Sequence, residues 1–258
     1  MNTAKTDRQK GATRIIAVAN HKGGVGKTTT VASLGAALAE TGKKVLLVDL
    51  DAQSNLSSSL LKGNHTRTLY EAMKEGKGLP VLPVKYLLDL SPASLDLAGV
   101  ELEIASQMER EYLLKDLLDE VEGSGYDYIL LDCPPSLGLL TLNAFAAATE
   151  VVIPLTAEAL PSKGLQKITD IISMVQRRMN TGLKLSGILI TRYEKSNLSQ
   201  MVEEAIRSTY GDLVFKTKIR KNIAVAEAPL YAQSVTDYAP TSNGAQDYRS
   251  LAKEIEER

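Results

Sequence analysis

The chain has 258 residues, of which 44% are hydrophobic and 24% are charged, and its formal net charge at pH 7 is −1. These values are typical of a soluble globular protein and exclude a strongly basic nucleic-acid-binding protein, so any contact with DNA requires a local basic cluster. Cys133 is the only cysteine. This excludes an intrachain disulfide and favours a reducing cytoplasm. No apolar run is long enough to span a bilayer, and the polar N-terminus does not resemble a signal peptide.

Strands and helices are predicted to alternate along the chain, a pattern typical of a mostly parallel sheet covered by helices on both faces. Strands are expected at 15–19, 45–49, 86–90, 128–132, 150–155 and 185–191, and helices at 31–38, 95–118, 137–148, 163–179, 199–210 and 251–257. Residues 60–85 are expected to form short helices and loops. Because no repeat or low-complexity linker divides the chain, we expect a flexible N-terminal tail over 1–13 and a single domain over 14–258.

A glycine-rich turn lies between the first predicted strand and the first predicted helix. It consists of His21, Lys22, Gly23, Gly24, Val25, Gly26, Lys27, Thr28 and Thr29. Without intervening Cβ atoms, successive backbone N–H groups can wrap a phosphate. Lys27 can then reach the β- and γ-phosphates of a nucleotide, and the Thr28 hydroxyl can ligate Mg²⁺. The usual P-loop has glycine at the position of His21, and Lys22 is an additional lysine. The segment predicts ATP and Mg²⁺ as ligands.

Acidic residues follow two of the buried strands. Asp132 ends the predicted strand 128–132 and is the candidate carboxylate for the metal site. Asp49 ends the strand 45–49 and either supports the metal or caps the loop that follows it. Asp51 projects to the same side as Asp49 and is the candidate for placing the attacking water. Because ligands collect beyond the carboxyl ends of parallel strands, we expect these side chains to lie near the glycine-rich turn.

Three segments together resemble the ParA family of deviant Walker A ATPases, which segregate plasmids and chromosomes or position other cargo: residues 22–29, 49–53 and 132–138. The resemblance covers nearly the whole chain. It implies a three-layer P-loop fold with a single ATPase domain, ATP and Mg²⁺ as cofactors, and an ATP-dependent homodimer. It also implies binding of non-specific double-stranded DNA in the ATP state and release by a ParB-like centromere-binding protein that stimulates a weak basal hydrolysis. The short N-terminal tail leaves no room for a helix-turn-helix domain, as in the short, Soj-like members.

The resemblance also implies roles for individual residues. Lys22 matches the signature lysine that reaches the phosphates of the partner subunit, and it is catalytic together with Lys27 and Asp51. The metal would be held by Thr28 and Asp132, with Asp49 in support. The nucleotide would be bound by residues 22–29, and its adenine would be flanked by Arg192, Arg220 and Asn222.

A basic cluster provides the candidate DNA contact. Its members are Lys216, Lys218, Arg220 and Lys221, and the alternative interpretation is a solvated edge of the fold. ParA-family proteins that bind non-specific DNA often have Pro-Arg-Asn where this chain has Arg-Lys-Asn at 220–222. The arginine that often follows a proline near their C-terminus is missing here.

Two other functions are possible on the same fold. A MinD-like regulator of cell division, or another cargo-positioning ATPase that cycles on a membrane, needs a basic amphipathic C-terminal helix. Residues 248–258 are short and carry as many acidic as basic side chains, so we expect no membrane binding and a cytoplasmic protein that joins the nucleoid when ATP-bound. An iron–sulfur carrier needs at least two thiolates per chain, whereas Cys133 is expected to be a small buried hydrophobic residue.

Overall fold

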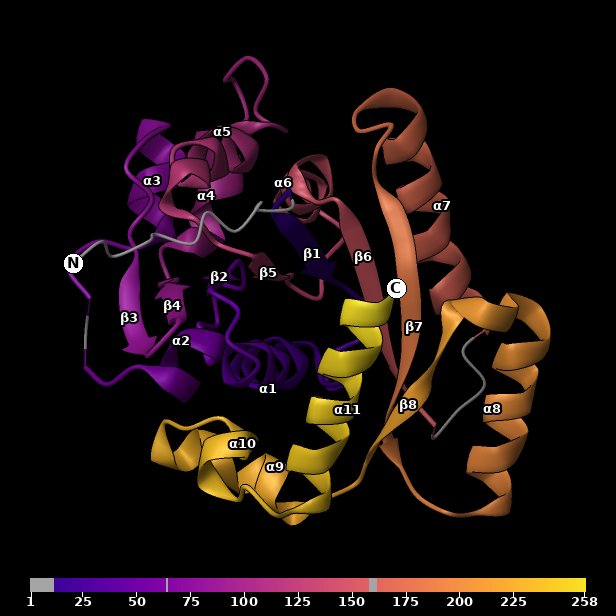
Figure 1. The fold of residues 1–258 in the computed structure, drawn as a ribbon. Coiled ribbons are helices and arrows are strands. Elements are labelled where there is room, and N and C mark those ends of the chain that lie inside the picture. Colours follow the sequence, from indigo (N-terminus) through magenta and orange to yellow (C-terminus); the bar gives the residue numbers. More distant parts are fainter. Residues whose placement is uncertain (1–11, 64, 158–161) are drawn as a thin grey trace, which may run out of the picture.

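The computed structural model describes residues 12–63, 65–157 and 162–258 (Figure 1), so the predicted N-terminal tail lies almost entirely outside the described residues. Within these ranges, strands form one sheet in the order β3-β4-β2-β5-β1-β6-β7-β8. All neighbouring strands are parallel except the pair β3 and β4. The strands are β1 (Arg14–Val18), β2 (Val45–Asp49), β3 (Leu82–Lys85), β4 (Leu88–Ser91), β5 (Tyr128–Asp132), β6 (Glu150–Thr156), β7 (Lys184–Tyr193) and β8 (Val214–Arg220).

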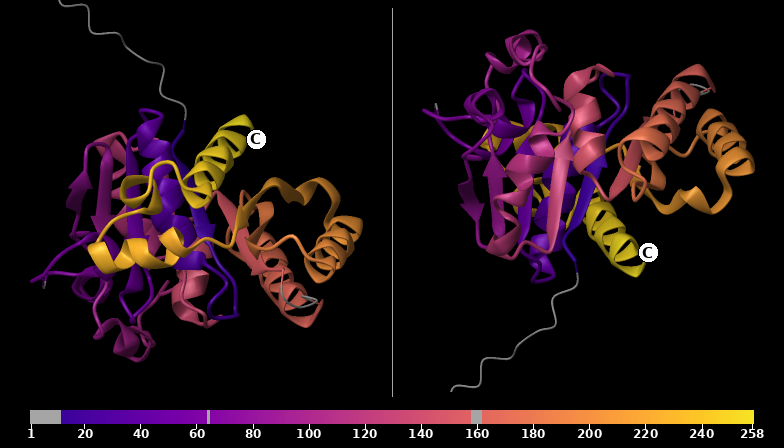
Figure 2. Two further views of the ribbon diagram at one scale, coloured as in Figure 1. Left: turned by 90° about the horizontal axis from the view of Figure 1, so that it is seen from below. Right: turned by 90° about the horizontal axis from the view of Figure 1, so that it is seen from above.

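Helices cover both faces of the sheet, which confirms the predicted three-layer α/β class. One face packs against α1 (Lys27–Glu40), α2 (Asn55–Leu60), α9 (Ile223–Glu227), α10 (Val235–Tyr238) and α11 (Asn243–Glu257). The other face packs against α3 (Leu69–Glu75), α4 (Leu97–Glu103), α5 (Leu113–Asp119), α6 (Leu139–Ala147), α7 (Ser162–Arg178) and α8 (Asn197–Tyr210). Figure 2 shows the early strands and helices at one side of the molecule and α7, α8 and β8 at the other.

Alternation of side chains along the central strands explains the two cores. Along β5, Leu130 packs into the core beneath α1, whereas Ile129 and Leu131 pack into the core beneath α6. Every residue of β5 is buried. A strand that is covered on both faces has a continuous apolar sequence, and this is why the central strands were predicted correctly.

Several sequence-based predictions of individual elements were wrong. The expected helix at 95–118 is two helices, α4 and α5, and Glu109 in the connection has a positive φ of 57° that no helix accommodates. Strand β8 was missed because it is an edge strand that carries charged side chains among its apolar ones. The last helix begins at Asn243 rather than 251, because the Ser242 side chain accepts a hydrogen bond from Ala245 N and caps it.

The carboxyl ends of the parallel strands place the predicted site residues at one edge of the sheet. Asp132, the last residue of β5, is in register with Val18 of β1 on one side and with Asp49 of β2 on the other. The glycine-rich turn starts directly after β1. The segments that carried the resemblance are therefore adjacent in the fold, as expected from the sequence.

Candidate active site

The glycine-rich turn connects β1 to α1 and leaves space beside it for a ligand. Gly24 and Gly26 have φ values of 74° and 86°, a conformation that favours glycine. A Cβ atom added to Gly23 or Gly24 would meet no other atom within 4 Å. The first turn of α1 has no acidic residue and no side-chain cap, so its N–H groups are available to an anion.

Two buried polar side chains hold this turn against the neighbouring strands. The Asn20 amide donates to Pro154 O at 2.7 Å, and its oxygen accepts from Lys22 N at 3.1 Å. The Thr191 hydroxyl lies 2.8 Å from Val25 O. Neither anchoring role was predicted from the sequence, although a polar residue directly after a buried strand, as at Asn20, indicates such a role.

Lys27 and Asp132 form the buried, charged centre of the site. Lys27 is 8% exposed, and its ammonium group lies 3.5 Å from Lys22 O. Burial lowers the pKa of Lys27, and the carboxylates of Asp132 and Asp51 oppose this shift. The turn thus places a cation beside the space at Gly23 and Gly24.

The Asp132 carboxylate is the unusual feature of this site. It is 1% exposed, and neither of its oxygens has a hydrogen-bond partner of regular geometry among the described residues, although the Thr28 hydroxyl is close enough to act on it. Burial, followed by the nearby carboxylate of Asp49, raises the pKa of Asp132 well above its usual value, and the Thr28 hydroxyl and Lys27 oppose the rise. Buried carboxylate oxygens are normally hydrogen-bonded or bound to a cation. Asp132 and the Thr28 hydroxyl therefore provide an oxygen donor set of the kind that Mg²⁺ prefers.

Asp49 lies next to Asp132 in the sheet but has a full set of partners. One oxygen accepts from Asp51 N at 3.1 Å, and the other accepts from Ser57 N at 2.9 Å and from the Ser57 hydroxyl at 2.7 Å. Burial raises the pKa of Asp49 to about 6, although these hydrogen bonds lower it. The geometry matches the alternative in which Asp49 caps the loop that follows β2.

Asp51 is half-buried at the start of this loop. One of its oxygens accepts from Gln53 N at 3.0 Å, and the other accepts no hydrogen bond from the described residues. Asp51 is also close enough to Lys27 to raise the pKa of that lysine. One Asp51 oxygen is thus open to a further hydrogen bond in the neighbourhood of Lys27.

A surface pocket of about 650 Å³ opens at the carboxyl ends of β7 and β8. Its lining residues are Tyr193, Glu194, Lys195, Gln200, Arg220, Lys221, Asn222, Ile223 and Asn243. Two of the three residues predicted to flank adenine, Arg220 and Asn222, thus lie in its wall. Arg192 is exposed, has a φ of 50°, and is not in the wall. The Asn222 oxygen accepts from Ala224 N at 2.8 Å, so its NH₂ group is available to a ligand.

Lys22 lies on the exposed part of the turn. Its backbone N–H is held by Asn20 and its carbonyl by Lys27, while the residue as a whole is exposed to solvent. The backbone is therefore held by hydrogen bonds, whereas the residue is open to solvent. This arrangement suits a group that acts on another molecule.

Most of the basic cluster is engaged in ion pairs. Lys218 contacts Glu203 at 2.7 Å and lies over the Tyr193 ring, and Lys221 contacts Glu194 at 2.6 Å. Arg220 contacts Asp247 of α11 at 2.6 Å. Among the described residues, Lys216 has no ion-pair partner within 4 Å.

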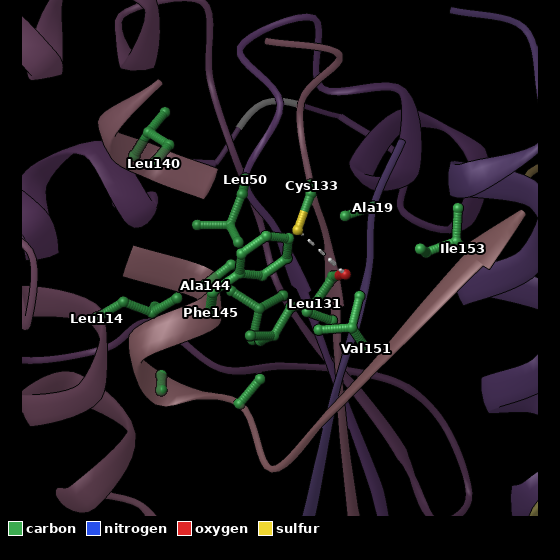
Figure 3. Close-up of a cluster of buried hydrophobic side chains, with 14 of the residues drawn as sticks. Ala19, Leu50, Leu114, Leu131, Cys133, Leu140, Ala144, Phe145, Val151 and Ile153 are labelled. Atoms are coloured by element: carbon green, nitrogen blue, oxygen red, sulfur yellow. Dashed lines mark hydrogen bonds between the residues drawn. The ribbon is translucent and has the colours of Figure 1, made fainter. Parts of the chain in front are cut away.

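Cys133 follows Asp132 and belongs to the core. Figure 3 shows its sulfur among apolar side chains that include Leu50 and Phe145. Burial raises the pKa of its thiol, so the reactive thiolate is not formed near neutral pH. The prediction of a small buried hydrophobic residue is confirmed.

This fold and this site define a P-loop ATPase of the deviant Walker A type, in which a second lysine precedes the glycines. A family model described as an AAA domain matches residues 13–185. The chain is 41% identical over 248 residues to the sporulation initiation inhibitor protein Soj of Bacillus subtilis, covering 94% of this chain and 98% of that protein. It is 41% identical over 249 residues to the chromosome partitioning protein ParA of Caulobacter vibrioides, covering 94% and 93%.

The fold is also similar to a solved structure from Mycobacterium smegmatis, with a TM-score of 0.81 and 38% sequence identity over 93% of each chain. That structure is named as cobyrinic acid a,c-diamide synthase with bound ADP and magnesium. The chain belongs to the ParA family of partitioning ATPases. Among its described residues, no helix is both long enough and apolar enough to cross a membrane.

Proposed function

We propose that this protein hydrolyses ATP with Mg²⁺ at the site formed by the glycine-rich turn, Lys27, Asp51 and Asp132. The observation that carries the proposal is the Asp132 carboxylate, which is buried without a hydrogen-bond partner beside an open glycine cradle. The backbone N–H groups of the turn and of α1 would bind phosphate oxygens, and Lys27 would neutralise their charge. Asp51 would orient the attacking water. When bound at Thr28 and Asp132, Mg²⁺ would supply further positive charge at the phosphates.

ATP turnover and calorimetric binding test this proposal. We expect Mg²⁺ to strengthen ATP binding in the wild type, and Lys27→Ala to weaken it at least about tenfold, the loss of one charge-assisted contact. Lys253→Ala is the matched control, because that side chain is 78% exposed on the far end of α11. Equal ATP affinity in the Lys27 and Lys253 variants would contradict the proposed site.

The exposed Lys22 supports a shared site in a homodimer. A solvent-exposed lysine in the phosphate cradle, with its backbone held in place, can stabilise charge on a phosphoryl group bound by another subunit. The protein would then dimerise when ATP is bound, and hydrolysis would separate the subunits. Lys22→Ala is expected to retain nucleotide binding and to lose stimulated hydrolysis. Asp51→Ala is expected to accumulate an ATP-bound dimer, and a monomer alone in sizing chromatography with ATP and Mg²⁺ would count against this scheme.

The family relationship supports a role in DNA partition, since relatives are named as chromosome partitioning proteins. The ATP-bound dimer would bind double-stranded DNA without sequence preference, and a ParB-like protein would stimulate hydrolysis and release it. Lys216 is the best-placed contact within the basic cluster, because the other three members already have carboxylate partners. Such binding would associate the protein with the nucleoid.

DNA binding is measured by an ATP-dependent mobility shift at several salt concentrations. Lys216→Ala is expected to weaken binding equally for unrelated sequences and to lower the salt slope by about one. Lys253→Ala again provides an exposed lysine as control. If the two variants shift DNA equally well, the contact surface lies elsewhere on the dimer.

A further inference from the structure

The segment that follows Asp132 is anchored by a residue from a distant part of the chain. Residues 133–138 connect the end of β5 to α6. Helix α6 begins after Gly138, which has no side chain to cap it, and its first turn contains no acidic residue. Glu101 of α4 supplies the missing group, since its Oε1 accepts from Leu140 N at 3.0 Å. A carboxylate at this position also interacts favourably with the helix dipole.

Gly138 leaves the room that this carboxylate needs. A Cβ atom at Gly138 would lie 2.7 Å and 3.0 Å from the two oxygens of Glu101. The φ of Gly138 is −88°, so its backbone conformation does not itself require glycine. A methyl group at position 138 would therefore displace the Glu101 carboxylate from its present place.

The other contacts of the segment fix its two ends. At the sheet, Cys133 N donates to Val18 O at 3.2 Å. At the helix, the Thr141 hydroxyl donates to Ser136 O at 2.6 Å. Since no hydrogen bond holds the Asp132 carboxylate itself, its position depends on the backbone and on packing. The anchoring of residues 133–138 therefore bears on the geometry of the site.

We propose that Glu101 is a positioning residue for ATP hydrolysis, which holds residues 133–138 beside the nucleotide site by capping α6. The proposal rests on the proposed function, because it assigns Glu101 to the reaction at Asp132. Glu101 would not touch the nucleotide. It would fix the segment through which Asp132 is connected to α6, and so link the surface helix α4 to the site.

Steady-state kinetics of ATP hydrolysis test the role. Glu101→Ala is expected to lower kcat about tenfold while KM for ATP changes less than about twofold, because positioning affects the reaction more than ground-state binding. Glu101→Gln should restore most of the rate, since its amide oxygen can still accept from Leu140 N. Glu103→Ala is the matched control, because Glu103 is an exposed carboxylate on the same helix that pairs with Lys74. Equal rates for Glu101→Ala and Glu103→Ala, with an active wild type, would overturn the proposal.

A double-mutant cycle tests whether Glu101 acts through Gly138. Gly138→Ala is expected to lower kcat in the wild type, because the new methyl group displaces the Glu101 carboxylate. In Glu101→Ala the same substitution has room and is expected to change kcat little further. Independent, multiplying effects of the two substitutions would contradict the proposed contact.

Hydrogen exchange gives a readout that requires no turnover. Glu101→Ala is expected to accelerate exchange in a peptide covering residues 133–142, with no acceleration in Glu103→Ala. Unchanged exchange in this peptide would overturn the proposal whether or not ATP is hydrolysed. If Glu101→Ala accelerates exchange but the wild-type protein binds no ATP, the result contradicts the proposed function and not the capping contact.

Discussion

Replacement of Asp132 by alanine is expected to stabilise the nucleotide-free protein while impairing its response to ATP and Mg²⁺. Both carboxylate oxygens of Asp132 are buried without a hydrogen-bond partner among the described residues. Leaving a buried polar group unsatisfied costs about 1–3 kcal/mol. The alanine variant recovers this cost but loses the attraction to Lys27 and leaves a small cavity, so a net gain of about 1–2 kcal/mol is expected. This corresponds to a rise in Tm of about 2–8 °C for a chain of this size.

Asp49→Ala provides the matched comparison, because Asp49 is directly opposite Asp132 in the sheet. Its carboxylate accepts three hydrogen bonds, from Asp51 N, Ser57 N and the Ser57 hydroxyl. Their removal leaves buried donors unpaired and is expected to cost about 3 kcal/mol. The two substitutions remove the same chemical group and are predicted to change stability in opposite directions.

Thermal unfolding followed by circular dichroism, with and without a non-hydrolysable ATP analogue and Mg²⁺, measures both effects. The wild type is expected to gain stability from the ligands through linkage, and Asp132→Ala to gain much less. If Asp132→Ala lowers Tm in the absence of nucleotide as much as Asp49→Ala does, the buried oxygens have partners in solution. The assignment of Asp132 as an unsatisfied metal ligand would then be refuted.

Three further predictions concern stability and the nucleotide site. Thr191→Val removes the hydroxyl that donates to Val25 O and is expected to weaken ATP binding about fivefold in calorimetry. An unchanged affinity would contradict the anchoring role of Thr191. Gly187→Ala places a Cβ 2.6 Å from the Phe215 ring and is expected to lower the free energy of unfolding, measured in urea, by about 1–3 kcal/mol. An unchanged midpoint of urea unfolding would show that the ring can move away. Burial raises the pKa of Glu254, but hydrogen bonds from two backbone N–H groups of β8 lower it, and the net shift is downward. The Glu254 carboxylate therefore stabilises the fold above its unfolded pKa of about 4.3. This stabilisation is lost as the pH falls through the pKa that Glu254 has in the folded protein. Glu254→Gln is therefore expected to flatten the acid side of the stability profile, and parallel profiles would contradict this.

The central strands and the glycine-rich turn were predictable because local sequence determines them. Buried parallel strands have continuous apolar sequences, and the turn requires glycine at Gly24 and Gly26 for its positive φ values. Likewise, the positions of Asp49 and Asp132 at strand ends followed from the parallel topology.

Features that depend on tertiary contacts were not predictable in this way. The different roles of the two aspartates depend on Ser57, which reaches Asp49 and not Asp132. Edge strand β8 lacks the apolar pattern of a central strand because its solvent-facing positions carry charge. The capping of α6 by Glu101 joins positions 39 residues apart, and no local pattern encodes such a contact.

In the proposed dimer, Lys22 completes the active site of the partner subunit. Mixing Lys22→Ala protein with Asp51→Ala protein tests it most directly, because each is expected to be inactive alone. In a mixed dimer, the site of the Lys22→Ala subunit keeps its own Asp51 and receives Lys22 from its partner. An equimolar mixture is therefore predicted to recover about a quarter of the stimulated wild-type rate, since about half the dimers are mixed and each has one intact site. If both proteins are inactive alone and the mixture stays inactive while still forming dimers with ATP, Lys22 acts within its own subunit and does not complete the site of its partner.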